Sequence, residues 1–481
     1  MLAAVLAAVL TLSTGIGAPP PPTPPPMPRP ENGAERALAE LGPLTRLAPG
    51  IAHRGLRTTA AAGQVLGDVI EVDLTESTVH ADLLTPGAVA ARSSVAEMAD
   101  RTGATAGING DFFDIGRTNA PAGPAVMDGR PLKAAVPHGR RMGPAVPGAE
   151  IDYVFTVGTD RVARIDRLRL EAHVSGPSGT HPVVALNQYA VPVDGIGIFT
   201  PMWGEVDRSR TLCGTDVDRN APCAADQAEV LVHDGTVVQV GRPAGGRIPD
   251  GELALTGREE GAAAVRSLRV GDRVDIEYAL VPASGRPPEL AVGGSPIMFD
   301  GEPVPGLDGR ERAPRSAAGS SADGRRIWLL TLDGRQSDSV GATLRELASL
   351  LRDLDMDDAV NLDGGGSSTL VFRDSGASTV AIVNDPSGLT PRLVPNGIGI
   401  YTSSSERDQR RPAGEALEEQ DGVMRGPQAR RSGAEAIRPT ITGSSGTPFG
   451  PTGYRSVKRG GGERGCPWDC RAAPTPARPS V

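Results

Sequence analysis

The chain has 481 residues, of which 39% are hydrophobic, 22% charged and only 3% aromatic, and it contains 62 glycines and 44 prolines. This composition allows one large domain or two to three ordinary ones, and it predicts many turns rather than a helical bundle. The formal net charge is −9. Because no basic field is available, the charge argues against nucleic-acid-binding proteins as a class.

The first 18 residues resemble a signal peptide. An apolar stretch from Leu2 to Leu12 precedes small residues from Gly15 to Ala18, although the usual basic region is missing. The stretch is short for a bilayer span, and no later run approaches that length. We therefore expect residues 1–18 to be a signal peptide or a short anchor, the protein to be secreted, and no stable membrane span to follow.

The composition divides the rest of the chain into three parts. Residues 19–64 begin with PPPPTPPPMPRP and predict a Pro-rich linker with a variable N-terminal segment. Residues 65–403 carry the apolar periodicity of a folded domain. Residues 404–481 are rich in Arg, Gly, Pro, Ser and Glu, and this composition predicts a disordered tail.

The first half of the folded domain alternates between short strands and turns. Residues 68–74 and 79–84 predict a strand pair, and residues 93–103 predict a capped amphipathic helix that ends at Gly103. Three stretches place Asp-Gly between strands, which is the strongest short hairpin signal because both turn positions favour positive φ. We expect these hairpins at Asp128-Gly129, Asp234-Gly235 and Asp300-Gly301.

The second half predicts strand, helix, strand, tight loop and strand. RRIWLLTLDGRQ is the first strand, and apolar residues at 344, 347, 350, 351 and 354 lie on one helical face. AVNLD and STLVF are strands on either side of three glycines. Together the patterns predict an α+β fold, a hairpin-rich mixed β-sheet domain with a few helices.

The cysteines form two close pairs, and the histidines are scattered. Cys213 and Cys223 flank a polar segment and are expected to form a disulfide across a surface loop. For Cys466 and Cys470, a disulfide and free thiols are equally supported. None of the six histidines follows His233, and no clustered Cys/His set predicts a zinc site.

The stretch NLDGGGSSTL combines a carboxylate, three glycines and three hydroxyls. Asp363 ends a predicted strand, glycines let a ligand approach the backbone, and consecutive N–H groups can converge on an anion. The alternative is a tight turn that Asp363 caps. The candidate loop residues are Gly364, Gly365, Gly366, Ser367, Ser368 and Thr369.

Three further motifs place polar side chains beside predicted strands. NGDFFD offers carboxylates after a strand, with an Asx-turn as the alternative. TLDGRQ and RAPRSAAG offer arginines, whose planar fork matches phosphate, although a solvated charge explains them equally well. The candidates are Asn109, Asp111, Asp114, Arg312, Arg315, Asp333 and Arg335.

In this order, GINGDFFD, VGGSPIM, RSAAG, LDGRQ, NLDGGGSSTL and PNGIGIY resemble the phosphodiester glycosidase family, over roughly residues 65–403. VDGIGIFTPMWG also resembles a segment of that family. Asp111 stands where many members have a third glycine, and Ser316 where they often have threonine. The resemblance implies that the folded domain is catalytic and hydrolyses a sugar-1-phosphodiester at the anomeric C–O bond.

The residues fit that reaction. The departing phosphate monoester has a second pKa of about 6, so it needs less help from a general acid than an alcohol does. The oxocarbenium-like transition state still requires a nearby carboxylate. Asp363 is the first candidate, followed by Asp333 and Asp111. Arg315 and Arg335 are candidate phosphate clamps. The remaining candidates for substrate binding are Asn109, Gly364, Gly365, Gly366, Ser367 and Ser368.

Two other functions remain open on the sequence alone. The first is a secreted binding module for anionic cell-wall or capsular glycan. The second is a metal-assisted phosphodiesterase in which Asp111 and Asp363 hold Mg²⁺ or Ca²⁺; apart from that case no cofactor is expected. The sugar, its aglycone, the anomeric outcome, the acid and base assignment and the oligomeric state also stay open.

Overall fold

Four β-sheets and three helices build the fold. The computed structural model describes residues 39–388 and 390–402, all within one compact unit. The strand pairs assigned there are antiparallel except for one. The α+β class, the many hairpins and the small number of helices are confirmed, and the described strands form four separate sheets. The predicted signal peptide, the tail, and Cys466 with Cys470 lie outside the described residues.

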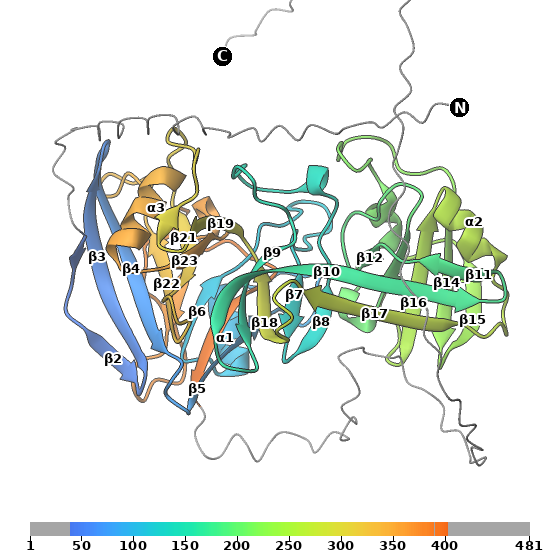
Figure 1. Cartoon of the computed structure of the whole chain (residues 1–481), viewed down its shortest axis with the longest axis horizontal. Coiled ribbons are helices and arrows are strands. Elements are labelled where there is room, and N and C mark those ends of the chain that lie inside the picture. The colour runs from blue at the N-terminus through green and yellow to red at the C-terminus, as the bar shows by residue number, and fades with distance from the viewer. Residues whose placement is uncertain (1–38, 389, 403–481) are drawn as a thin grey trace, which may run out of the picture. The chain divides into compact units, whose positions relative to one another are not determined.

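The largest sheet has nine strands, and it carries both the first described strands and the strand before the three glycines (Figure 1). Its order is β1-β3-β4-β22-β21-β23-β19-β20, with β2 also paired to β3. The strands are β1 Glu40–Leu41, β2 Thr45–Ala48, β3 Ile51–Ala60, β4 Gly63–Asp73, β19 Ser295–Phe299, β20 Glu302–Pro303, β21 Arg315–Ser320, β22 Arg326–Leu332 and β23 Asp358–Asn361.

A five-stranded sheet joins segments from the two ends of the described chain. Its order is β25-β24-β6-β26-β5, so the last described strand, β26, lies between β6 and β5. The strands are β5 Val79–Leu84, β6 Ala106–Asn109, β24 Leu370–Phe372, β25 Ala381–Ile382 and β26 Gly397–Thr402. The chain between β23 and β24 therefore passes from the nine-stranded sheet to this one.

Two further sheets come from the middle of the chain. The seven-stranded sheet has the order β11-β10-β9-β18-β7-β8, with β17 paired along β10 as a long ribbon (Figure 1). The other has the order β12-β13-β16-β14-β15. Their strands are β7 Ala125–Met127, β8 Arg130–Lys133, β9 Tyr153–Gly158, β10 Ala163–Gly176, β11 Gly179–Pro182, β12 Ala185–Leu186, β13 Ile196–Phe199, β14 Gln227–His233, β15 Thr236–Gly241, β16 Glu252–Arg258, β17 Asp275–Pro282 and β18 Pro288–Gly293.

The helices are short, and the cap predicted for the helix at residues 93–103 is confirmed. The helices α1 Val95–Thr102 and α3 Leu344–Asp353 both begin with a capping box, at Ser94 and Thr343. Gly103 ends α1 in the left-handed conformation with φ of 69°. The remaining helix is α2 Glu260–Ser267, and the short 3-10 helices are η1 His138–Arg140, η2 Pro201–Trp203, η3 Arg208–Leu212 and η4 Gly365–Ser367.

The burial of strand β22 on both faces explains why its sequence is continuously apolar. Ile327 and Leu329 pack into one hydrophobic cluster, whereas Trp328 and Leu330 pack into another, together with the apolar face of α3. Because both faces of the strand are buried, it does not alternate between apolar and polar residues. The end of this strand, which leads into Asp333, is therefore held on both sides.

The three Asp-Gly hairpins are confirmed, with positive φ at both turn residues of each. The predicted pairing of residues 68–74 with 79–84 is wrong. Strand β4 pairs with β3 and β22, whereas β5 pairs with β26 in another sheet, because those neighbours bury both strands. The expected linker, residues 19–64, ends in strands β1 to β3, and the expected start of the catalytic domain at residue 65 falls inside β4.

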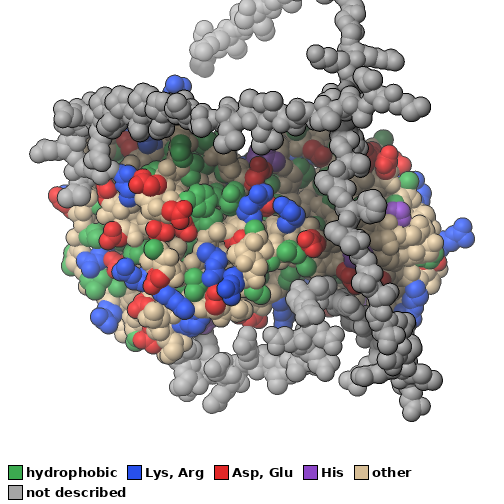
Figure 2. Space-filling model, in the orientation of Figure 1, with side chains coloured by type: hydrophobic (Ala, Val, Ile, Leu, Met, Phe, Trp, Pro, Cys, Tyr) green, Lys and Arg blue, Asp and Glu red, His purple; other side chains and the backbone are tan. Residues whose placement is uncertain are grey.

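The surface carries mixed charge. In the face shown in Figure 2, acidic and basic side chains are interspersed. No described helix is long and apolar enough to cross a membrane.

Candidate active site

The glycine loop is a tight connection in which each glycine meets a different neighbour. A Cβ on Gly364 would lie 2.7 Å from the carbonyl oxygen of Pro314. Gly365 has φ of 62°, a conformation that strongly favours glycine. A Cβ on Gly366 would lie 2.9 Å from Nη2 of Arg392. The close backbone therefore requires glycine at position 364, the positive φ favours it at 365, and a side chain at 366 would displace the guanidinium of Arg392.

The expected convergence of loop N–H groups on an anion is not what the backbone shows. The N–H of Gly365 donates to Pro314, and those of Ser367 and Ser368 donate to carbonyl oxygens of Gly364 and Gly365. These donors are occupied within the protein. An anion at this loop would depend chiefly on side chains.

Asp363 is half-buried at the start of the loop. Its backbone N–H donates to Gly110, and its carbonyl accepts from Nδ2 of Asn109 at 2.6 Å. Its Oδ2 accepts a 2.6 Å hydrogen bond from the hydroxyl of Ser367. Burial raises the pKa of Asp363 to about 7, with the charge of Asp111 adding to the rise, against the opposing effects of Ser367 and Arg392. A carboxyl that titrates near neutrality is suited to proton transfer.

Asp111 lies in a narrow space between two glycines. Its Oδ2 accepts a 2.6 Å hydrogen bond from the N–H of Gly123, and its own N–H donates to Oδ1 of Asn396 at 2.9 Å. A Cβ on Gly293 would lie 2.5 Å from the same Oδ2. Burial raises the pKa of Asp111, and the nearby charge of Lys133 opposes that rise. The expected Asx-turn does not describe this residue, because its acceptor atom faces a distant segment.

Two exposed arginines flank the loop. A Cβ on Gly365 would lie 3.2 Å from Nη1 of Arg335. Arg392 donates from Nη1 to the hydroxyl of Ser367 at 3.3 Å. Arg335 has φ of 62°, and such strain in a non-glycine residue often marks a functional position. The loop glycines and Asp363 therefore lie between two guanidinium groups.

The other two candidate arginines, Arg315 and Arg312, donate hydrogen bonds to backbone carbonyl oxygens. Arg315 is buried and donates to the carbonyl oxygens of Ala342 and Glu311 at 2.9 and 2.8 Å. Arg312 donates to Gly341 and forms an ion pair with Glu346. Their donors point into the protein, and the phosphate contact expected of Arg315 does not fit this arrangement.

Asn109 also supports the loop. It is fully buried, and its Oδ1 accepts from the hydroxyl of Ser316 at 2.8 Å and from the N–H of Thr369 at 3.1 Å. With Nδ2 bonded to Asp363, this side chain joins β6, β21 and both ends of the loop. It holds the catalytic candidate in place, and the substrate contact expected of it does not fit these bonds.

Asp333 lies beside the strand that follows the loop. Its Oδ1 accepts from the N–H of Asp385 at 3.0 Å and from Nδ2 of Asn384 at 3.3 Å. Asn384 also donates to the carbonyl of Ser368 at 3.2 Å. Burial raises the pKa of Asp333 to about 7. The structure thus couples Asp333 to the loop through an amide.

Several buried polar atoms around the loop have no hydrogen-bond partner among the described residues. The hydroxyls of Ser368 and Thr369, both side-chain atoms of Asn361 and Nδ2 of Asn396 are in this group. Buried polar groups normally find partners, so such a concentration is typical of a site that receives water or ligand.

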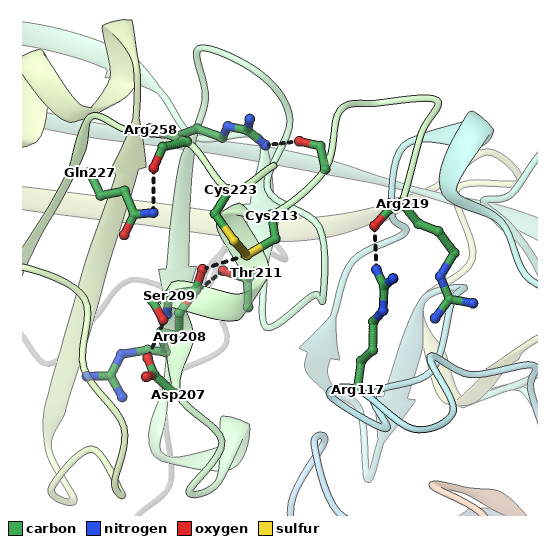
Figure 3. Close-up of a disulfide and its surroundings, with 12 residues drawn as sticks. Arg117, Asp207, Arg208, Ser209, Thr211, Cys213, Arg219, Cys223, Gln227 and Arg258 are labelled. Carbon is green, nitrogen blue, oxygen red and sulfur yellow. Dashed lines mark hydrogen bonds between the residues drawn. A yellow bond between two sulfur atoms is a disulfide. The ribbon is translucent and has the colours of Figure 1, made fainter. Parts of the chain in front are cut away.

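The disulfide is confirmed, and its loop supports the turn after Asp111 (Figure 3). Cys213 and Cys223 are bonded. Within their loop, the carbonyl of Arg219 accepts from Arg117. Arg219 also forms a 2.9 Å ion pair with Asp114. Asp114 also accepts from Thr118. Asp114 is therefore a structural residue.

For the metal-assisted alternative, the described residues contain no group of three or more His, Cys, Asp or Glu side chains placed to hold a metal ion. That alternative remains a prediction for a chelation experiment.

Comparison with known proteins supports the family resemblance. Residues 226–401 match the phosphodiester glycosidase family. The match covers less than half of the chain but contains the glycine loop, Asp333 and both flanking arginines, and it confirms the resemblance that the motifs indicate. No curated protein sequence gives a significant match.

Solved structures share the fold. A hypothetical protein from Synechocystis is 20% identical with a TM-score of 0.59, and the match covers 75% of this chain and 64% of that one. A candidate exported protein from Burkholderia pseudomallei is 18% identical with a TM-score of 0.59, over 76% of this chain and 97% of that one. The zebrafish N-acetylglucosamine-1-phosphodiester alpha-N-acetylglucosaminidase catalytic domain, auto-inhibited by its pro-peptide, is 15% identical over 76% and 88% of the two chains, but its TM-score of 0.38 supports no argument.

The sequence motifs missed three residues of the candidate site. Arg392 and Asn384 lie on the segment between β24 and β26, where no motif points to them. Lys133 carried one signal, because it is one of only two lysines in a chain with 49 basic residues.

Proposed function

We propose that this chain is an exported phosphodiester glycosidase that hydrolyses the anomeric C–O bond of a sugar-1-phosphodiester in a glycan or glycoconjugate. The family match supports the reaction class. The single observation that carries the proposal lies in the loop of three glycines, where the Ser367 hydroxyl donates to the Asp363 carboxyl and accepts from the guanidinium of Arg392, while the guanidinium of Arg335 lies beside Gly365.

The phosphate is assigned to the arginine side of the loop. Arg335 and Arg392 are exposed, whereas Arg315 has its donors on backbone carbonyls. A guanidinium offers a planar pair of donors to two phosphate oxygens. The two arginines would stabilise the charge that gathers on the phosphate as the bond to the sugar breaks.

The sugar carbon is assigned to the carboxyl side. Asp363 and Asp111 influence each other's ionisation, since the charge of Asp111 raises the pKa of Asp363. Two carboxyls whose proton affinities are coupled in this way are suited to divide the acid and base roles of glycoside hydrolysis. Asp333 is assigned a supporting role through Asn384.

Isotope labelling tests which bond breaks. In a glycosidase, water attacks C1 and the bridging oxygen leaves with phosphate, so hydrolysis in ¹⁸O-water labels the sugar hydroxyl. A metal-dependent phosphodiesterase attacks phosphorus and labels the phosphate. Label in phosphate, or loss of activity with chelator and recovery with Mg²⁺ or Ca²⁺, would favour the metal-assisted reaction. Binding of anionic glycan without turnover of any sugar-1-phosphodiester would favour the binding module.

Export is proposed on the N-terminal sequence and on the disulfide, because disulfides persist in oxidising compartments. Recovery of the protein from culture medium with its N-terminus near residue 19 is the expected result. Retention in the cytosol with Met1 intact would contradict it.

A further inference from the structure

Lys133 is an unusual residue for its position. It is the lysine at the end of β8, its side chain is 0% exposed, and the other lysine of the chain lies at position 458. Its Nζ donates to the carbonyl oxygens of Ala122, Gly123 and Ala134 at 3.2, 2.5 and 2.5 Å. Three acceptors match the three protons of an ammonium, whereas a neutral amine has two. Burial lowers the pKa of Lys133 to about 7, whereas the three acceptors and the charge of Asp111 favour its charged form.

One peptide unit connects Lys133 to Asp111. The carbonyl of Gly123 accepts from Lys133, and its N–H donates to Oδ2 of Asp111. A Cβ on Gly123 would lie 2.8 Å from the Cα of Gly293, so the segment is fixed against β18. The position of the Lys133 ammonium thus sets the position of the donor that holds the Asp111 carboxylate.

The charged and titratable groups around Asp111 include both cations and another carboxyl. Lys133 on β8 and Arg141 after η1 both favour its ionised form. The charge of Asp111 in turn raises the pKa of Asp363 on the glycine loop, and it also raises the pKa of Tyr189. The charged neighbours of Asp363 are different, because Arg392 lowers its pKa and the carboxyl of Asp111 raises it. The buried cation is therefore on the Asp111 side of the pair.

We propose that Lys133 is a positioning residue that fixes Asp111 through Gly123 and opposes its charge, so that Asp111 is the ionised carboxyl of the pair and Asp363 holds the proton. The assignment of roles rests on the proposed glycosidase reaction. Asp111 then presents negative charge to the developing positive charge at the anomeric carbon. Asp363 presents a protonated carboxyl on the side of the loop where Arg335 and Arg392 lie.

The experiment follows the side-chain carboxyl ¹³C signals of aspartate during a pH titration of the full-length protein, without substrate. Asp111→Asn and Asp363→Asn identify the two signals by their disappearance. In the unaltered protein, the Asp111 signal is expected to titrate at lower pH than the Asp363 signal. The reverse order would overturn the proposal, whatever the enzyme hydrolyses and whether or not a lysine variant folds.

Lys133→Gln keeps donors to the carbonyl oxygens and removes the charge. It is expected to raise the titration midpoint of Asp111 by about one pH unit or more, a tenfold change in proton affinity. Arg130→Gln, at the exposed start of the same strand, is the matched control and is expected to leave the midpoint unchanged. An unchanged midpoint in Lys133→Gln, or an equal shift in Arg130→Gln, would refute the role of Lys133.

Activity adds a separate readout. If a sugar-1-phosphodiester is turned over, the acid limb of the kcat/KM profile in Lys133→Gln moves upward by the same amount as the ¹³C midpoint. A uniform loss at all pH values, with no movement of the limb, would show that Lys133 acts only in folding. If no substrate is found, the ¹³C titration still tests the charge arrangement, and the failure falls on the proposed function alone.

Discussion

Replacing Gly365 with alanine separates a functional loop from a structural turn. Gly365 has φ of 62°, and an L-residue in that region costs about 1–2 kcal/mol. For a large domain, 1 kcal/mol lowers Tm by roughly 2–4 °C. Gly365→Ala is therefore expected to fold and to melt only a few degrees below the unaltered protein.

The effect on activity is expected to be much larger. The new Cβ would lie 3.2 Å from Nη1 of Arg335, so the guanidinium must move by some tenths of an ångström. A misplacement of about 1 Å in a positioning group can lower the rate about a hundredfold. We expect kcat/KM for a sugar-1-phosphodiester to fall by roughly tenfold to a hundredfold.

Gly376→Ala is the matched control. Gly376 has φ of 83° and lies in the turn between β24 and β25. A Cβ on Gly376 would meet nothing within 4 Å. Both variants carry similar backbone strain, but only Gly365→Ala disturbs an arginine. Steady-state kinetics and thermal melts of both variants show whether the loop is functional or only a turn. Equal activities in the two variants, or unfolding of Gly365→Ala alone, would show that the loop is only a turn.

Three further predictions concern the carboxyls and the disulfide. Asp363→Asn is expected to lower kcat/KM at least about a hundredfold with little change in Tm, and near-normal turnover would remove Asp363 from the mechanism. Cys223→Ser is expected to cost about 3 kcal/mol of stability from the loop length alone, measured by denaturant unfolding, and to lower activity because Arg219 no longer anchors the turn after Asp111; full activity would contradict that support. Burial raises the pKa of Asp82 to about 6 and of Asp333 to about 7, so the folded protein binds more protons than the unfolded chain and stability falls as pH rises from about 4 to about 7. Tm measured across that range is expected to decline, Asp82→Asn is expected to reduce the slope, and a rising Tm would refute the sign.

The local elements followed from the sequence because short-range chemistry specifies them. Asp128-Gly129 and its two counterparts dictate their own turns through positive φ, and Ser94 and Thr343 cap their helices with acceptors three residues away from a glutamate. The predicted strand pairing was wrong because contacts between distant parts of the sequence select the partner strand. Strand β5 alternates correctly, but its partner β26 comes from the far end of the described chain.

The candidate site was predictable in its loop and not in its surroundings. Asp363 and the three glycines are contiguous, so the motif reveals them together. Arg315 and Arg392 are equally plausible phosphate ligands in a sequence, and only the structure shows that one is buried against carbonyls while the other lies against Gly366. The link between Lys133 and Asp111 passes through a backbone peptide and leaves no periodic signal.

The position of β26 inside the five-stranded sheet has a consequence for biosynthesis. Strands β5 and β6 emerge early from the ribosome, yet each pairs with β26, which emerges after every other described strand. A nascent chain therefore holds two unsatisfied strand edges until residue 402 is available, and pairing across such sequence distances slows folding. Asn109 lies at the end of β6 and donates to Asp363, so both share this delay. A chain that ends before β26 is therefore expected not to complete the candidate site.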